Sequence, residues 1–241
     1  RLSIRADIYN STGTIWLDDF LVAEEVEREY HPVRGAVTRT DTGLSFTGAV
    51  PDLGLTLEAT LRDDRQCVRV DGLVRDTTGA DRAVGVRFEL PLSAAGWTWY
   101  NDAQEAQTVG TDTVHRYTYS GCEAGEGECS IYPWSALSGP QAGLSLALPL
   151  EQGPRIFIIE HDQRRPRYSI TFFFGLSPDA AQNPSCAPFS LVLYRHDPAW
   201  GMRSAMERYY DLFPDSFHKR PPFEGYLNYA LYEQLDPQTH E

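Results

Sequence analysis

The sequence has almost no lysine and no long apolar run, and each shortage excludes a class of protein. Lys219 is the single lysine among the 21 lysine and arginine residues. The chain has 34 acidic residues, so its net charge is −13. A chain with this charge repels polyanions, so binding to nucleic acid is not expected. No apolar stretch approaches the roughly 20 residues that a membrane-spanning helix needs. A membrane span is therefore not expected either.

Short catalytic and metal-binding motifs are also missing. The four cysteines include no C-x-x-C pair and have no histidine at zinc-finger spacing, which excludes a structural zinc site of that kind. No G-x-S-x-G, P-loop or dinucleotide-binding fingerprint occurs. Acidic residues are abundant, but no short motif singles out a pair of them. The sequence therefore predicts no catalytic residue.

The cysteines divide into one close pair and two distant residues. Cys122 and Cys129 bracket the loop CEAGEGEC, and a disulfide between them would pin it. Cys67 and Cys186 are candidates for a second bridge between strands. The even count and the Asn-Ser-Thr sequon at Asn10 favour an oxidising compartment, so we expect a secreted or cell-surface protein. The alternative is that Cys67 and Cys186 are buried free thiols and that only the loop carries a disulfide.

Alternation of apolar and polar residues dominates the chain. Residues 2–8 and 14–22 alternate around a turn, which predicts a hairpin. Further strands are predicted at residues 44–46, 53–61, 66–75, 82–90, 108–119, 144–148, 155–160, 168–174 and 189–194. Gly, Pro and Asp turns separate them, and no helices alternate with them. The pattern predicts a mainly β protein, an antiparallel β-sandwich with one C-terminal amphipathic helix.

That helix is predicted over residues 198–213. Asp197 is placed to cap it, and Pro198 suits its first position, where a missing N–H costs nothing. Its apolar face combines Met202, Met206, Tyr209 and Phe213, widened by Trp200, Ala205 and Leu212. This face must be covered, either by the sandwich or by a neighbour outside these 241 residues. If the sandwich leaves Tyr209, Tyr210 and Phe213 open to solvent, a neighbour outside this chain is required.

Aromatic residues in two loops are candidates for carbohydrate binding. Trp97, Trp99 and Tyr100 lie in GWTWYND with Asp102, and Trp134 follows the cysteine-bracketed loop. Sugar rings stack on flat aromatic faces while carboxylates and amides bind their hydroxyls. The alternative is that Trp97 and Trp99, two residues apart, face one side of a strand and pack in the core. Trp134 has the same alternative.

The opening of the chain carries the adjacent carboxylates Asp18 and Asp19. An inward-facing carboxylate beside backbone carbonyls can hold a structural Ca²⁺, whereas a solvated strand end is the alternative. Gly13, Thr14, Ile15, Trp16, Asp18 and Asp19 together resemble the closing strand of a jelly-roll carbohydrate-binding module. In such modules this strand lies near a structural calcium, so the resemblance favours calcium at Asp18 or Asp19.

A second resemblance covers most of residues 33–220. The phrases YPWSALSGPQAGLSLALPL, ITFFFGLSPD and FSLVLYRHDPAWGMRSAMERYYDLFPDSFHKR are similar to the β-supersandwich (galactose-mutarotase-like) domain that precedes a catalytic (β/α)₈ barrel in glycoside-hydrolase-like proteins. The resemblance implies that catalytic carboxylates lie in the barrel, so none is assigned here. Because no barrel occurs before Glu241 and the chain starts inside a strand, we expect a fragment or a processed product.

Together these features predict four segments. Residues 1–30 are the last strands of a jelly-roll-like module, 31–197 the supersandwich, 198–217 an exit helix, and 218–241 an irregular linker or tail. The predicted function is a non-catalytic accessory region of a secreted carbohydrate-active protein, with a barrel domain or subunit as its partner.

Two alternatives to this function stay open. The sandwich could itself act on sugars, as an epimerase or lyase does, with His115, His161 and Glu160 as first candidates on predicted strands. It could also be a structural protein that assembles into filaments through its edge strands.

Overall fold

The computed structural model describes residues 30–100, 105–116, 118–119, 129–130, 132–152 and 156–217. The predicted jelly-roll strands and the tail after residue 217 lie outside this part of the chain. The compact unit described below begins at Val33. No helix in the described ranges is long and apolar enough to cross a membrane.

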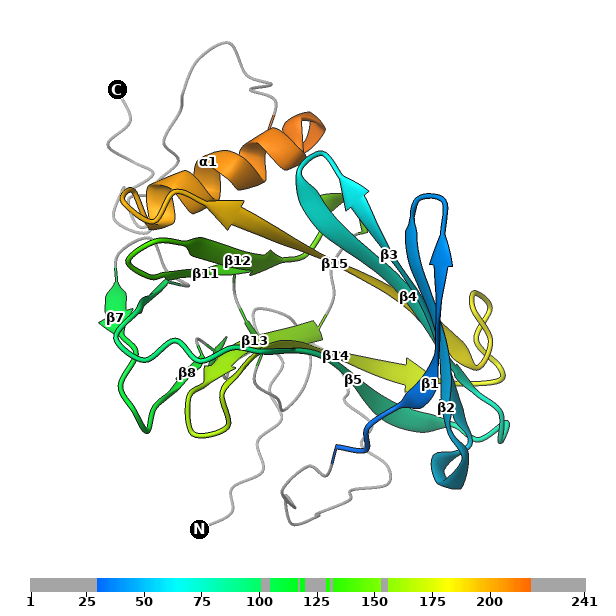
Figure 1. Cartoon of the computed structure of the whole chain (residues 1–241). Coiled ribbons are helices and arrows are strands. Elements are labelled where there is room, and N and C mark those ends of the chain that lie inside the picture. The colour runs from blue at the N-terminus through cyan, green and yellow to red at the C-terminus, as the bar shows by residue number, and fades with distance from the viewer. Residues whose placement is uncertain are drawn as a thin grey trace, which may run out of the picture. The chain divides into compact units, whose positions relative to one another are not determined.

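Nine antiparallel strands form the larger of two main sheets (Figure 1). In spatial order they are β1 (Arg34–Thr40), β2 (Gly43–Val50), β3 (Leu55–Asp64), β4 (Cys67–Asp76), β15 (Cys186–His196), β12 (Gly143–Ala147), β11 (Trp134–Ser138), β6 (Thr98–Tyr100) and β7 (Ala106–Thr108). Consecutive strands β1 to β4 form a meander of hairpins. This meander places β1 at one edge of the sheet.

The smaller sheet has four antiparallel strands and faces the larger one (Figure 1). Its order is β5 (Arg82–Pro91), β14 (Arg167–Leu176), β13 (Ile156–Asp162) and β8 (Val114–Arg116). A short ladder joins β9 (Thr118–Tyr119) to β10 (Cys129–Ser130). Short 3₁₀ turns are η1 (Pro51–Leu53), η2 (Leu150–Gln152) and η3 (Pro214–Ser216).

The main core fills the space between the two sheets. Alternate residues of β14, among them Tyr168, Ile170 and Phe172, point into it from the smaller sheet. Phe189 and Leu191 of β15 meet them from the larger sheet. Two antiparallel sheets packed face to face around one core confirm the predicted β-sandwich.

The single helix near the C-terminal end of the described residues, α1 (Met202–Leu212), begins later than predicted. A turn over residues 198–200 precedes it, in which the N–H of Ala199 donates to Oδ1 of Asp197 at 2.9 Å. Gly201 has a φ of 48°, a backbone conformation that residues with side chains rarely adopt. Asp197 therefore caps a turn rather than the helix. Trp200, expected on the apolar face, is 64% exposed instead.

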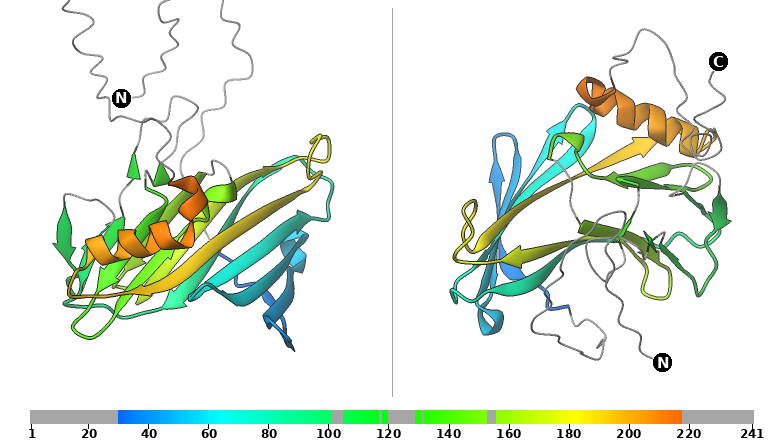
Figure 2. Two further views of the ribbon diagram at one scale, coloured as in Figure 1. Left: turned by 90° about the horizontal axis from the view of Figure 1, so that it is seen from above. Right: turned by 180° about the vertical axis from the view of Figure 1, so that it is seen from behind.

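Helix α1 lies on the outer face of the larger sheet, against β12 and β15 (Figures 1 and 2). Its buried stripe joins a second core cluster with Trp134, Val192 and Tyr194 of the sheet. Tyr209 is 1% and Phe213 8% exposed. The sandwich therefore covers Tyr209 and Phe213, whereas Tyr210, the third residue of the prediction, is 41% exposed.

Replacing Tyr209 by Phe is expected to lower the free energy of unfolding by about 1–2 kcal/mol. The Tyr209 hydroxyl donates to the buried backbone carbonyl of Leu148 at 2.7 Å, and the substitution leaves that carbonyl without this bond. Urea unfolding at neutral pH measures the change. Tyr210→Phe is the matched control, since Tyr210 is 41% exposed and should change little. Equal effects of the two substitutions would contradict this account of how the helix docks.

The predicted bridge between Cys67 and Cys186 is wrong, because both residues are free thiols. Each begins its own strand, and β4 and β15 run antiparallel, so Cys67 pairs with Tyr194 while Cys186 pairs with Arg75. The two cysteines therefore lie at opposite ends of the ladder. Burial raises the pKa of the Cys67 thiol to about 11. Cys122 lies outside the described residues, so its bridge to Cys129 stays a prediction.

Candidate functional site

Two histidines face each other on neighbouring strands of the smaller sheet. His115 of β8 lies directly opposite His161 of β13 in the antiparallel register. Both rings point toward the larger sheet, where they lie 6.1 and 6.5 Å from the ring of Trp99. His115 is 7% exposed and His161 is fully buried. The fold thus brings together two of the three residues proposed for sugar chemistry.

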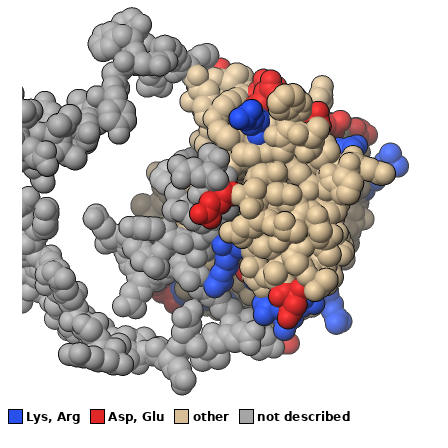
Figure 3. Space-filling view, turned by 90° about the vertical axis from the view of Figure 1, so that its left-hand side faces the viewer, with Lys and Arg blue, Asp and Glu red and all other residues tan. Residues whose placement is uncertain are grey.

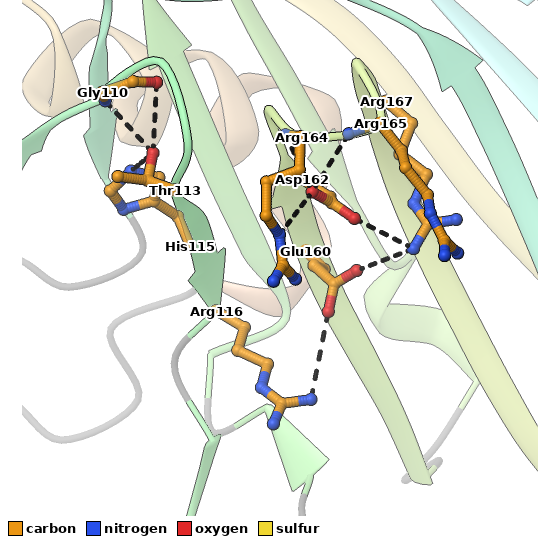
Figure 4. Close-up of polar contacts among 9 residues, drawn as sticks. All are labelled: Gly110, Thr113, His115, Arg116, Glu160, Asp162, Arg164, Arg165 and Arg167. Carbon is orange, nitrogen blue, oxygen red and sulfur yellow. Dashed lines mark hydrogen bonds and ion pairs between the residues drawn. The ribbon is translucent and has the colours of Figure 1, made fainter. Parts of the chain in front are cut away.

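Both imidazoles are held by hydrogen bonds. Nδ1 of His115 lies 2.9 Å from Oε1 of Gln107, and its Nε2 lies 2.9 Å from Oγ1 of Thr113 (Figure 4 shows the threonine contact). His161 Nε2 contacts the carbonyl oxygen of Leu92 at 3.3 Å, whereas its Nδ1 has no hydrogen-bond partner in the described ranges. Burial lowers the pKa of both imidazoles. The pair is therefore neutral at neutral pH.

Tyr168 of β14 completes this inner layer and links the two sheets. Its ring lies 5.9 Å from Trp99 and 6.4 Å from His161. The hydroxyl donates to the carbonyl oxygen of Ser135 at 2.9 Å and accepts the backbone N–H of Leu146 at 3.0 Å, and both partners belong to the larger sheet. Burial raises the pKa of Tyr168, so it stays a neutral phenol. The inner aromatic cluster is defined as Trp99, His115, His161 and Tyr168.

Glu160 lies on the other face of β13. Successive side chains of a strand point to opposite sides, so Glu160 projects away from His161. Figure 4 shows Glu160 between the arginines Arg116 and Arg167. Its carboxylate lies 3.6 Å from the guanidinium of Arg167 and 3.9 Å from that of Arg116. Glu160 is an ion-pair partner on the outer face of the smaller sheet, and the structure does not bring it to the imidazoles.

Asp162 holds the turn between β13 and β14. Its Oδ1 accepts the backbone N–H groups of Arg164 and Arg165 at 3.0 and 3.3 Å, and its Oδ2 lies 3.3 Å from Arg167 (Figure 4). Burial alone would raise the pKa of this carboxyl group, but the Arg165 N–H and the arginine charges lower it overall. Asp162 therefore stays ionised as a structural group.

The chemistry open to the inner aromatic cluster is limited by access. General acid–base catalysis requires a titratable group within hydrogen-bond reach of a substrate. Trp99 and Tyr168 belong to the main core, and the imidazoles of His115 and His161 are 7% and 0% exposed. A cleft of about 270 Å³ lies elsewhere, beside the end of α1, with a mixed lining that includes Arg65, Arg69, Glu151, Phe213 and Asp215. Its lining contains neither histidine of the cluster.

The four predicted carbohydrate-binding residues that the structure describes do not form one surface. Trp99 is 1% exposed between the sheets, and Trp134 is 6% exposed beneath α1. Buried rings offer no face for a sugar, so we assign these two to packing. Trp97 is half-buried at the margin of the main core, and Tyr100 is half-buried on the opposite side, with the helix cluster. Asp102 lies outside the described residues.

The predicted calcium ligands, Asp18 and Asp19, also lie outside the described residues. Within the described part of the chain, no group of three or more His, Cys, Asp or Glu residues is placed to hold a metal ion. A calcium site near the start of the chain therefore stays a prediction.

Sequence reasoning missed the residues that hold the histidines in place. Tyr168 and Gln107 come from different sheets and lie far apart in the sequence. The available signal was chemical: a tyrosine inside an apolar strand needs a partner for its hydroxyl. The identity of that partner depends on strand pairing, which the sequence pattern does not encode.

No protein-family model and no curated protein sequence matches the chain. Among solved structures, Slr1438 from Synechocystis sp. PCC 6803 is 6% identical with a TM-score of 0.38, over 68% of this chain and 65% of that one. A candidate aldose 1-epimerase from Escherichia coli K12 is 9% identical with a TM-score of 0.39, over 68% of each chain. The GH36 α-galactosidase AgaA from Geobacillus stearothermophilus is 11% identical with a TM-score of 0.44, over 76% of this chain and 29% of that one. Likeness at this level says nothing about activity.

Proposed function

We propose that the chain is a non-catalytic accessory β-sandwich of a secreted carbohydrate-active protein. In that role it supports, or positions substrate for, a catalytic (β/α)₈ barrel in the same polypeptide or in a partner subunit. The placement of the titratable side chains carries the proposal. His115 and His161 are buried as neutral rings, whereas Glu160 and Asp162 are held in ion pairs on the other face. Two catalytic groups do not meet across an open cleft in the described ranges.

An uncharged surface at one end of the sandwich supports the carbohydrate part of the proposal. Figure 3 views the end at which β7 lies, and a broad area of the described surface there has no charged side chain. All three residues of β7 are exposed. The backbone carbonyl of Trp97 accepts a hydrogen bond from the N–H of Val109, the residue directly after β7, at 2.8 Å. Neutral glycans stack on aromatic rings and bond to uncharged polar groups. We therefore place the proposed sugar contact at Trp97 and Gln107.

The 241-residue chain is expected to show no glycosidase, epimerase or lyase activity, because its histidines are out of reach of a substrate. Assays with neutral oligosaccharides and free aldoses measure this. The rival function, a sandwich that acts on sugars through His115, His161 and Glu160, requires turnover. Reproducible turnover that is lost when His161 is replaced would establish the rival and overturn the accessory role.

Binding to a neutral polysaccharide is the positive counterpart of that test. Neutral polysaccharides in the gel should retard the chain in affinity electrophoresis. Trp97→Leu should raise the dissociation constant for the polysaccharide about fivefold or more. Leucine keeps an apolar contact at the margin of the core but removes the flat ring. Tyr210→Leu is the matched control on exposed helix surface. Retardation that Trp97→Leu leaves unchanged would place the sugar contact elsewhere.

Three further features belong to this proposal without a structural test. They are secretion, a disulfide between Cys122 and Cys129, and a structural Ca²⁺ at Asp18 or Asp19. An oxidising compartment would be consistent with the disulfide and with glycosylation at Asn10.

A further inference from the structure

Strand β1 forms a long edge of the larger sheet in the described part of the chain. Its seven residues pair one-to-one with β2, without a bulge, and its other edge pairs with no strand that the structure describes. All seven residues are exposed. An exposed edge presents a row of backbone N–H and C=O groups that can pair with another extended segment.

The other sheet edges differ from β1. The far edge of the larger sheet, β7, and one edge of the smaller sheet, β8, have only three residues each. The remaining edge, β5, carries charges of both signs and ends in proline at Pro91. Short strands, charges and proline are the usual protections of an edge. Strand β1 contains no proline or lysine, and it exposes the apolar side chain of Val37, which is 63% exposed.

The charged residues of β1 itself are of one sign. Arg34 and Arg39 are the charged residues of β1, and β2 beside it has no charged side chain. No ion pair joins either arginine to another described residue. In a chain of net charge −13, the two arginines make β1 a cationic strip, with one carboxylate, Asp41, in the turn at its end. A second copy of the chain would bring two more arginines to the strip, whereas an acidic segment would neutralise them.

We propose that β1 binds an extended acidic segment of a partner protein, which adds an antiparallel strand to the larger sheet. The spacing defines the segment. Residues opposite Arg39 and Arg34 are five positions apart and project to opposite faces of the sheet, as the two arginines do. The residue opposite Val37 lies between them. The segment therefore carries a carboxylate, an apolar residue two positions later, and a second carboxylate three positions after that. This proposal does not depend on the proposed sugar-related function.

The test uses the full chain and an acetylated peptide, Thr-Glu-Thr-Val-Thr-Thr-Glu-Thr. Titration followed by amide ¹H–¹⁵N spectra should shift the signals of residues 34–40 and slow hydrogen exchange of the β1 amides that point outward. The double variant Arg34→Glu/Arg39→Glu should bind this peptide about tenfold or more weakly. The same variant should bind the peptide with Lys in place of both Glu residues more tightly than the wild-type chain does. Tighter binding of the Lys peptide by the double variant would show that the variant is folded.

Controls separate pairing at β1 from general attraction. Arg203→Glu changes an exposed arginine on α1 and should leave binding of the acidic peptide unchanged. Equal loss with Arg203→Glu, or signal changes that avoid residues 34–40, would overturn the proposal. A concentration-dependent dimer that maps to β1 without peptide would assign the edge to a second copy and would also overturn it.

Discussion

Trp99→Ala is expected to lower the free energy of unfolding by about 4 kcal/mol. Trp99 is 1% exposed and is the largest fully buried side chain among the described residues. Its ring contacts Tyr168 edge-on, at 5.9 Å, and lies beside both histidines of the inner aromatic cluster. Rigid strands on both sides cannot collapse into the space that the indole leaves. The cost therefore combines lost burial with a cavity.

Urea unfolding followed by circular dichroism measures this effect. Trp200→Ala is the matched control, since Trp200 is 64% exposed and its removal should change the free energy of unfolding by about 0.5 kcal/mol or less. A cost below about 1 kcal/mol for Trp99→Ala would show that the two sheets do not close on this ring.

The alternation of residues predicted most strands, because a half-buried strand imposes a period of two on the sequence. It did not reveal which sheet a strand joins. Residues 108–119 were expected to form one strand, but the chain crosses between sheets there. Strand β7 belongs to the larger sheet and β8 to the smaller one, and the segment between them turns at Gly110, whose N–H donates to Oγ1 of Thr113 at 3.1 Å. Local periodicity carries no information about that crossing.

Residue spacing predicted the candidate site only in part, for the same reason. His115 and His161 were proposed as separate strand residues, and only the register of β8 with β13 makes them neighbours. Because side chains alternate along a strand, Glu160 lies on the opposite face from its neighbour His161, and the sequence alone was enough to predict this. Burial was harder to predict. Trp97 and Trp99 share one side of the chain, but their depth depends on the opposing sheet, and so Trp99 is buried while Trp97 lies at the margin.

Acidification from pH 6.5 toward pH 4 is expected to destabilise the folded chain, with His196 as a main cause. His196 is 7% exposed, and its Nε2 and Nδ1 lie 2.8 Å from the hydroxyl oxygens of Ser138 and Ser145. The ring fits against Gly143, where an added Cβ would lie 2.4 Å from it. Burial lowers the pKa of His196 from 6.5 to about 4, while nearby Asp197 opposes the shift.

The sign of the effect follows from proton binding. Between pH 6.5 and about 4 the unfolded chain protonates this histidine while the folded chain does not, so the unfolded state binds more protons and stability falls as the pH falls. The full effect of His196 is about 3 kcal/mol at the lower end of the window. His115 and His161 act in the same direction, since burial lowers their pKa values too. The lowered pKa values of Asp71 and Asp162 affect the free energy of unfolding at pH values below this window.

Urea unfolding at several pH values between 7 and 4 measures the slope, and His196→Gln isolates one contribution. Glutamine has no proton to gain in this range and retains polar atoms for the two serine hydroxyls. Within the window, the free energy of unfolding of the variant should fall less steeply with falling pH than that of the wild-type chain, by up to about 1.4 kcal/mol per pH unit. The reason is that the variant takes up one proton fewer on unfolding. Its stability at pH 7 is expected to be lower than that of the wild-type chain, and the two curves should converge toward pH 4. Parallel curves would show that His196 is already protonated in the folded protein, or that its ring is open to water.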